Sequence, residues 1–164
     1  MSLSLPRTAF ESILKHLVEV EDEKEYVLNV CFPLYKDREG MRTLIDDYIL
    51  RMNDLISRIK VYERAKNDAT GLNGLPESIT LPFVMVGSEV SVAILDQNEQ
   101  VDYRVQHPFK TNGSRDEISY VSPLGAALLL KEPGQEVIIK IPAGKLRYRV
   151  ESIRLITESD GRPL

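Results

Sequence analysis

The residues of this sequence that could do chemistry are few and lie far apart. His16 and His107 have no carboxylate or cysteine at a spacing that predicts a metal site or a catalytic pair, so we expect surface or packing roles for both. Cys31 is the one cysteine, which excludes an internal disulfide, and no Cys/His spacing predicts a zinc site. These residues predict no metal, no cofactor and no catalytic residues of the chain's own.

Charged residues gather at two places in the sequence. The acidic run from Glu19 to Glu25 is expected to be solvated helix surface. The formal net charge of -4 argues against a protein that holds nucleic acid by neutralising phosphates alone. With no Trp and four Phe, stacking platforms for single strands are not evident, and a protein partner is the better expectation. Basic residues near the C-terminus are Lys140, Lys145, Arg147, Arg149 and Arg154.

The composition is that of a soluble folded protein, with 43% hydrophobic and 28% charged residues in a chain of 164. That length suits one ordinary domain or two small ones. No window is apolar over the roughly 18 residues that suggest a membrane span. Residues 1–7 lack the apolar core of a signal peptide. We therefore expect a cytoplasmic protein.

The first third of the chain predicts two helices that pack along one seam. Apolar residues recur with alternating steps of three and four, the spacing of a coiled coil. When one series is paired with the other in reverse, the residue numbers of every layer sum to 72, which predicts a fold-back centred near Lys36. Lys24 is the one polar seam member, and its stem could pack on Tyr48. The series are Phe10, Ile13, Leu17, Val20, Lys24, Val27 and Cys31, and Met41, Ile45, Tyr48, Met52, Leu55, Ile59 and Tyr62.

The expected turn covers residues 32–40, where Pro33 ends the first helix and Gly40 permits the reversal. Thr8 and Glu11 predict a capping box at the start of the first helix. Two helices of about 26 residues would project roughly 40 Å. We therefore predict a protruding arm with a functional tip at about 33–40. A compact bundle is the alternative, but the sequence offers no third helix to complete it.

The second half predicts a small β-rich domain. Loop formers cluster before it, and Ser122 and Pro123 predict the cap and first position of one short helix. Strands are expected at 83–86, 90–95, 101–105, 118–121, 137–141 and 146–155. The predicted fold class is α+β: an N-terminal antiparallel two-helix coiled-coil hairpin (1–68), a linker (69–80), an antiparallel β domain with one short helix (81–157) and a tail (158–164). The expected core comprises Val84, Val92, Ile94, Tyr103, Leu128, Leu129, Ile139, Tyr148 and Val150.

The stretch from Tyr120 to Gly144, YVSPLGAALLLKEPGQEVIIKIPAG, resembles the C-terminal domain of the GreA/GreB transcript-cleavage factors. A Ser-Pro pair opens a short Ala/Leu helix, and a basic-acidic-Gly turn, a strand and a Pro-Gly hairpin follow. The helix is also similar to that of the smaller Gre relative Rnk. The match runs through Ser122, Pro123, Ala127, Leu128, Lys131, Gly134, Val137, Pro142 and Gly144.

The resemblance implies an FKBP-like fold for the second domain and a transcription elongation regulator that docks on RNA polymerase. The hairpin tip would enter the secondary channel, in indirect contact with nascent RNA and DNA, and we expect a monomer. Ser122 and Pro123 carry over as polymerase contacts, although a plain helix cap is an alternative that can coexist with docking. Arg147 and Arg149 share one face of the last hairpin. That face is either solvated or a contact for acidic polymerase surface or nucleic acid.

Gre cleavage factors place acidic residues at the hairpin tip, where carboxylates would hold a Mg²⁺ ion shared with the polymerase. In this chain Asp37 and Glu39 are the expected tip acids, but Lys36 and Arg38 alternate with them, so the tip is neutral overall. The family's cleavage motif, an Asp followed closely by Glu-Asn-Ala-Glu-Tyr, is absent. Three outcomes stay open: stimulated cleavage; channel binding that pauses, inhibits or competes with true Gre factors; or a merely solvated turn.

Two other classes of function also stay open. FKBP-like folds include prolyl isomerases and chaperones, but these rely on an aromatic pocket usually floored by Trp, which this chain lacks. The other hypothesis is a coiled-coil adaptor that self-associates through the hairpin.

Overall fold

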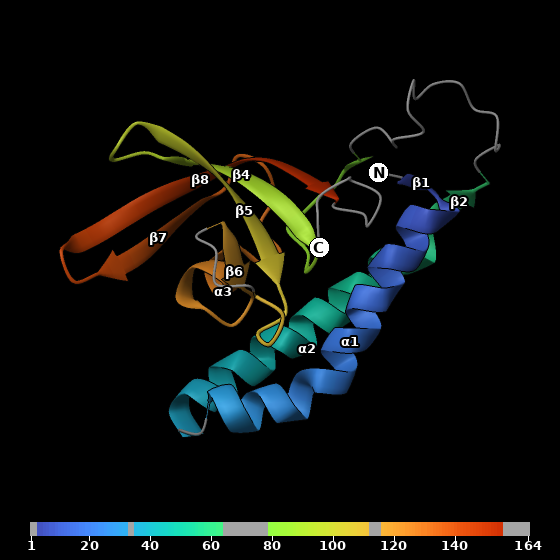
Figure 1. Ribbon diagram of the computed structural model, residues 1–164, viewed down its shortest axis with the longest axis horizontal. Helices are drawn as coiled ribbons and strands as arrows, with labels where there is room; N and C mark the ends of the chain where they lie inside the picture. Colours follow the sequence, from blue (N-terminus) through green and yellow to red (C-terminus); the bar gives the residue numbers. More distant parts are fainter. Residues whose placement is uncertain (1–2, 33–34, 64–78, 112–115, 156–164) are drawn as a thin grey trace.

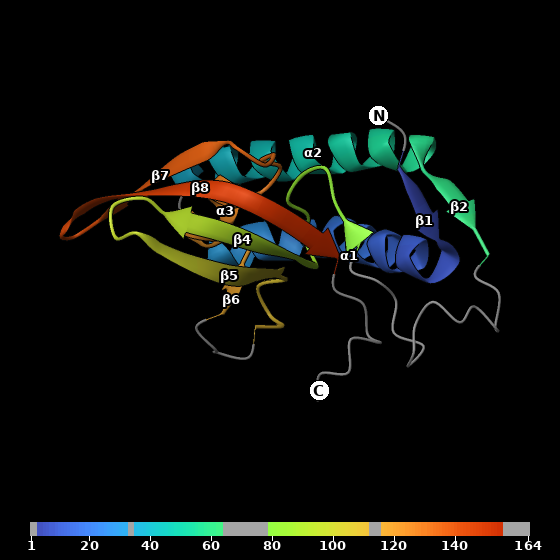
Figure 2. The ribbon, with the colours of Figure 1, turned by 90° about the horizontal axis from the view of Figure 1, so that it is seen from above.

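The computed structural model describes residues 3–32, 35–63, 79–111 and 116–155, with the backbone alone given for residues 35–37. Pro33, most of the expected linker and the expected tail lie outside the described residues. Two long helices run side by side in opposite directions, and a β domain leans against them (Figures 1 and 2). No described helix combines the length and the apolar character that crossing a membrane requires.

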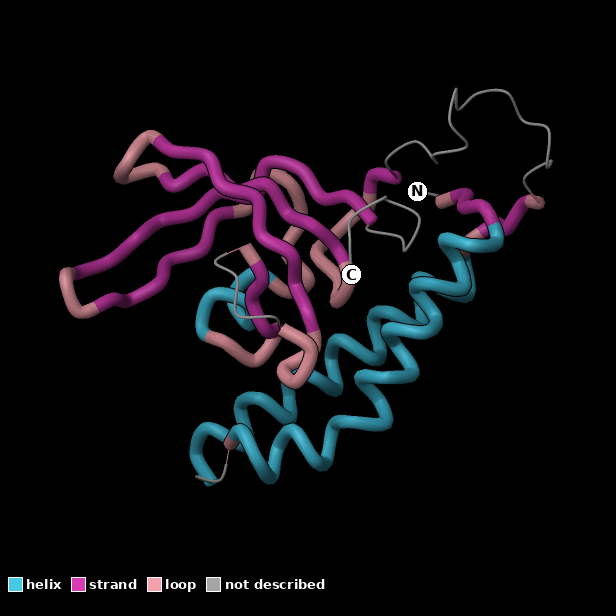
Figure 3. Tube along the Cα trace, in the orientation of Figure 1, coloured by secondary structure: helices cyan, strands magenta, loops and turns pink. Residues whose placement is uncertain are grey.

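The described elements follow the predicted order of a helical pair and then a sheet that encloses one short helix (Figure 3). They are β1 (Ser4–Pro6), α1 (Arg7–Cys31), α2 (Tyr35–Arg58), β2 (Lys60–Tyr62), β3 (Ile79–Thr80), β4 (Ser88–Ile94), β5 (Glu99–Gln106), β6 (Glu117–Ser119), α3 (Pro123–Leu128), β7 (Glu136–Ile141) and β8 (Gly144–Leu155).

The helical hairpin, α1 with α2, is confirmed, and its seam is buried along most of its length. Lys24 is half-buried, and its amine binds Asp46 across the hairpin. Arg42 also crosses from α2, to Glu25 at 2.9 Å. Buried seam residues are Ile13, Leu17, Val20 and Val27 of α1 and Met41, Ile45, Tyr48 and Met52 of α2.

The base of the hairpin differs from the prediction. Thr8 lies inside α1, which begins at Arg7 without a side-chain cap, so the expected capping box is wrong. The strand β1, just before α1, instead pairs in parallel with β2, the strand that follows α2. Tyr62, expected on the seam, lies in β2 and is 49% exposed. The β-branched and aromatic residues around Val61 favour an extended chain over a further helical turn.

The reversal of the chain comes earlier than predicted. Because α1 ends at Cys31 and α2 already begins at Tyr35, the fold-back is not centred near Lys36. Residues 35–39 contain neither Pro nor Gly, so nothing opposes a helix there. Gly40 sits within α2, where glycine costs only about 1 kcal/mol relative to alanine. The turn is therefore shorter than the expected span of 32–40.

The sheet has the strand order β3-β8-β4-β5-β6, and β7 also pairs with β8. Most pairs are antiparallel, but β5 and β6 run parallel, which corrects the expectation of a purely antiparallel domain. The strand expected at 83–86 is also wrong, because this segment is irregular although buried. The backbone of Val84 forms its hydrogen bonds outside the sheet. Its N–H donates to the Lys131 carbonyl, and its carbonyl accepts from the Leu130 amide, both at 2.9 Å.

The short helix α3 is positioned by its first residues, as predicted. The Ser122 hydroxyl accepts a hydrogen bond from the Gly125 amide at 3.1 Å and donates to the Ser119 carbonyl at 2.7 Å. A side chain at position 125 would overlap the Ser119 carbonyl, so only glycine allows this close approach of helix and strand end. The expected core is buried except for Tyr103 and Ile139, which are half-buried.

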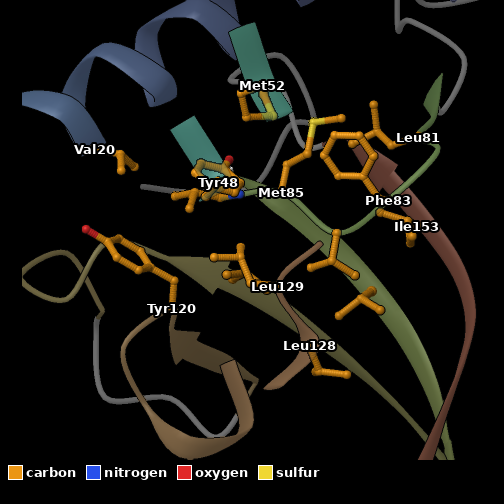
Figure 4. Close-up of a cluster of buried hydrophobic side chains, with 14 of the residues drawn as sticks. Val20, Tyr48, Met52, Leu81, Phe83, Met85, Tyr120, Leu128, Leu129 and Ile153 are labelled. Carbon is orange, nitrogen blue, oxygen red and sulfur yellow. Dashed lines mark hydrogen bonds between the residues drawn. The ribbon is translucent and has the colours of Figure 1, made fainter. Parts of the chain in front are cut away.

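The hairpin and the β domain share one hydrophobic core. Tyr48 of α2 is 1% exposed and lies among β-domain side chains, together with Val20 and Met52 (Figure 4). Its hydroxyl accepts a hydrogen bond from the Val86 amide at 2.9 Å. The Arg51 guanidinium lies 4.6 Å from the centre of the Phe83 ring. The middle of the hairpin is therefore docked on the β domain, which corrects the expectation of an arm that protrudes along its whole length.

Replacing Tyr48 by Phe tests how far this docking supports the fold. The variant keeps the ring but leaves the buried Val86 amide without its acceptor, which should lower the free energy of unfolding by about 1–3 kcal/mol. Urea denaturation followed by circular dichroism measures this change. Tyr26→Phe is the matched control, because Tyr26 is 60% exposed and its variant should change stability by under about 0.5 kcal/mol. Equal stability of both variants would contradict the role given to the Tyr48 hydroxyl.

Candidate functional site

The two acids expected at the hairpin tip lie near the start of α2. Asp37 is within the first turns of that helix, where only its backbone is described. The Glu39 side chain is exposed to solvent. Arg38, which alternates with them in the sequence, donates a hydrogen bond to Asn29 of α1 at 2.5 Å. The basic group that separates the two acids in the sequence is therefore tied to the facing helix.

The expected docking pair lies at the start of α3. Pro123 is exposed, whereas Ser122 is half-buried and uses its hydroxyl as the helix cap. The capping role of Ser122 is thus present in the structure, and Pro123 is the member of the pair that presents its surface to solvent.

The two arginines of the last hairpin both have acidic neighbours within the domain. Arg147 lies 3.5 Å from Asp96, and its backbone amide also donates to that carboxylate at 3.0 Å. Arg149 donates to Glu151 at 2.9 Å. Both side chains are about half exposed, at 52% and 43%. Their charges are partly compensated, so this face is not a strongly basic patch.

The most closely knit polar group of the described residues lies where α1 meets the ends of β5 and β6. His107, which is 1% exposed, is its centre. Its Nε2 lies 3.0 Å from His16 Nδ1 and 3.2 Å from Glu19 Oε2, and its Nδ1 lies 2.7 Å from Glu23 Oε1. The Tyr120 hydroxyl donates to Glu23 at 2.8 Å. We call these residues, with the Lys110 amine that binds Glu19, the His107 cluster.

The surroundings set the protonation of several members of the His107 cluster. Burial, reinforced by His107, lowers the pKa of His16 to about 4, so this imidazole is neutral at neutral pH. The partial burial of Glu19 raises its pKa, but the hydrogen bond from Lys110 and nearby positive charges outweigh this effect, so the pKa of Glu19 is lowered. Burial and the hydrogen bond to Glu23 raise the pKa of Tyr120 far above its usual range, so Tyr120 acts as a donor. The cluster thus combines the neutral imidazole of His16, the ionised carboxylate of Glu19 and the hydroxyl of Tyr120, which stays protonated.

The His107 cluster differs from the prediction that its histidines lack carboxylate neighbours and that Glu19 and Glu23 are solvated. His16 and His107 do meet carboxylates, and Glu19 and Glu23 are half-buried instead of solvated. The sequence held one signal: His16, Glu19 and Glu23 follow one another at spacings of three and four, which places them on one helix face. Nothing local linked this face to His107, which lies 91 positions from His16. Gly87 (φ +92°) completes the site, because a side chain there would overlap the His16 ring.

Comparisons with known proteins agree with the fold. Residues 80–155 match the family described as transcription elongation factor, GreA/GreB, C-term. The transcription elongation factor GreA of Francisella philomiragia is 26% identical over 149 residues, which cover 91% of this chain and 84% of that protein. The GreA of Desulfovibrio desulfuricans is 28% identical over 138 residues, covering 84% of this chain and 76% of that protein.

A solved structure shares the same architecture. The prokaryotic transcription elongation factor GreA/GreB from Nitrosomonas europaea aligns with a TM-score of 0.51 and 19% identity, covering 93% of this chain and 98% of that one. Its likeness extends the agreement from the C-terminal domain to the order of hairpin and sheet. The resemblance inferred from residues 120–144 is therefore confirmed: residues 80–155 match the C-terminal domain of the GreA/GreB elongation factors, and the chain is similar to GreA factors over most of its length.

Proposed function

We propose that this protein is a transcription elongation regulator that binds RNA polymerase, as its GreA/GreB relatives imply. The observation that carries the proposal is the family match over residues 80–155, placed directly after a helical hairpin. In this proposal the β domain, with the FKBP-like fold implied by the resemblance, docks beside the secondary channel. The hairpin tip then enters the channel and comes near the nascent RNA. Neither the prolyl isomerase nor the adaptor alternative is favoured by the similarity to elongation factors.

The proposed docking surface includes the start of α3. Pro123 is exposed there, and the capped Ser122 holds the helix end in place. Arg147 and Arg149 are proposed as secondary contacts, because each is already partly neutralised by its own carboxylate neighbour. Such charges contribute more to association rate and orientation than to affinity.

The proposed action of the tip is modulation of elongation with little or no stimulated cleavage. A shared Mg²⁺ ion needs several oxygen ligands with surplus negative charge. Asp37 and Glu39 alternate with Lys36 and Arg38, so the tip contributes no net negative charge. Arg38 is moreover held across the hairpin by Asn29. Pausing, inhibition or competition with cleavage factors fits this charge balance better.

Pro123→Glu tests the docking surface. A glutamate at the first position of a helix suits the helix dipole, so α3 should persist, whereas a charge on a contact surface should weaken binding about tenfold, or about 1.4 kcal/mol. Affinity for bacterial core RNA polymerase is measured by interferometry. Gln97→Glu is the matched control, since it adds the same charge at an exposed turn between β4 and β5. If both variants bind like the wild type, α3 is not the docking surface.

A backtracked elongation complex tests the action of the tip. We expect the wild-type protein to release little or no short RNA, because the tip lacks a net negative charge. Asp37→Ala and Glu39→Ala should then change cleavage little, and Asp47→Ala, an exposed acid farther along α2, serves as the control. The proposal of weak cleavage is wrong if the wild type gives strong Mg²⁺-dependent RNA release that both tip variants abolish.

A further inference from the structure

The His107 cluster holds ligand atoms that converge from two sides. Among the described residues, His16, Glu19 and His107 are the group whose ligand atoms could hold a metal ion, and these atoms lie within 4.8 Å of one another. His16 and Glu19 project from one face of α1, and His107 follows β5 directly. The group therefore spans the contact between the hairpin and the β domain.

The contacts of His107 bring ligand atoms of two other residues close to its Nε2 atom. Nδ1 lies 2.7 Å from a Glu23 oxygen and donates its hydrogen to that carboxylate, so Nε2 is directed toward His16 and Glu19. This Nε2 atom lies 3.2 Å from Glu19 Oε2 and 3.0 Å from His16 Nδ1. Two imidazole nitrogens and one carboxylate oxygen, all kinds of ligand that a divalent metal ion binds, therefore converge at one place.

Glu23 and Tyr120 provide the surroundings that a metal-bound histidine usually has. Such a histidine generally donates its other ring N–H to a carboxylate, which fixes the ring and makes the ligand nitrogen more basic. Glu23 occupies this position against His107, and it is held in turn by the Tyr120 hydroxyl at 2.8 Å. The ring of His107 is thus oriented with Nε2 toward His16 and Glu19.

We propose that His16, Glu19 and His107 bind a Zn²⁺ ion that joins the hairpin to the β domain. Two imidazoles and one carboxylate are an established zinc ligand set that leaves a fourth position for water. Zn–N bonds of about 2.0–2.1 Å in a tetrahedron separate ligand atoms by about 3.3 Å. The 3.2 Å between His107 and Glu19 fits this value, and the 3.0 Å between the two rings has to open slightly. The site does not depend on polymerase binding, and it replaces the expectation that the chain has no metal.

Lys110 competes with the ion for Glu19. Its amine binds the same Oε2 atom that faces His107, so it has to leave when a metal enters. The Lys110 side chain is 53% exposed and can move into water. Lys110→Met keeps much of the aliphatic stem and removes the competing charge. The variant should therefore bind Zn²⁺ more tightly than the wild type, by about tenfold if one ion pair of about 1.4 kcal/mol is removed.

The test uses the untagged full-length protein after treatment with a chelator. Calorimetric titration with ZnCl₂ should show one ion per chain, CoCl₂ should give visible d–d absorption, and Zn²⁺ should raise the melting temperature. Glu23→Gln should weaken Zn²⁺ binding about 10–100-fold, as expected for a residue that orients a ligand. His16→Gln and Glu19→Gln should weaken it further. Glu21→Gln, an exposed acid on the same helix, should leave it unchanged.

Circular dichroism verifies that each variant is folded before its affinity is interpreted. The proposal is overturned if the wild type binds neither ion at millimolar concentration. It is also overturned if folded His16→Gln and Glu19→Gln bind Zn²⁺ as the wild type does, or if Lys110→Met weakens binding. In each of these cases the cluster is held together by its hydrogen bonds and by the Lys110–Glu19 ion pair alone.

Discussion

The contact between α1 and the strand ends of the β domain is the constraint that organises this molecule. His107 is almost completely buried between two carboxylates, and these come from a helix near the other end of the sequence. Buried polar groups persist only when they are hydrogen-bonded, and leaving one without its partner costs about 1–3 kcal/mol. The hairpin therefore cannot be moved away from the sheet without finding new partners for these groups. The buried Tyr48 hydrogen bond to Val86 imposes the same condition from α2.

Elements that depend on local pattern were predictable from the sequence. The seam from Ile13 to Met52 follows from apolar spacing alone, because each helix must bury its apolar stripe. The cap formed by Ser122 and the start of α3 at Pro123 follow from the chemistry of two adjacent residues. These features were predicted correctly because residue types and spacings within single short segments are enough to reveal them.

Features decided by distant partners escaped the sequence analysis. The helix face of His16, Glu19 and Glu23 looked like solvated surface, since its polar partner His107 lies far along the chain. The segment around Val84 resembled a strand, but its backbone pairs with the residues after α3 instead. The parallel pairing of β5 with β6 depends on where the loop between them returns, which no local pattern encodes. Of the candidate site, the positions of Pro123 and Glu39 at the surface were foreseeable, whereas the His107 cluster was not.

The docked hairpin sets a geometric condition on the proposed function. α1 has 25 residues and is about 37 Å long, but its last ring contact with the β domain is at Tyr26. About one and a half turns, or roughly 7–8 Å, extend beyond that contact. A tip that acts deep inside a partner reaches farther when the hairpin separates from the sheet. The hydrogen bonds and ion pairs at this interface oppose such separation, but water can take the place of each lost partner, which lowers the free-energy cost of opening. A cation that binds both sides of the His107 cluster has the opposite effect, since its ligands cannot separate while it is bound. The cluster is therefore the place where solution conditions can act on the reach of the hairpin.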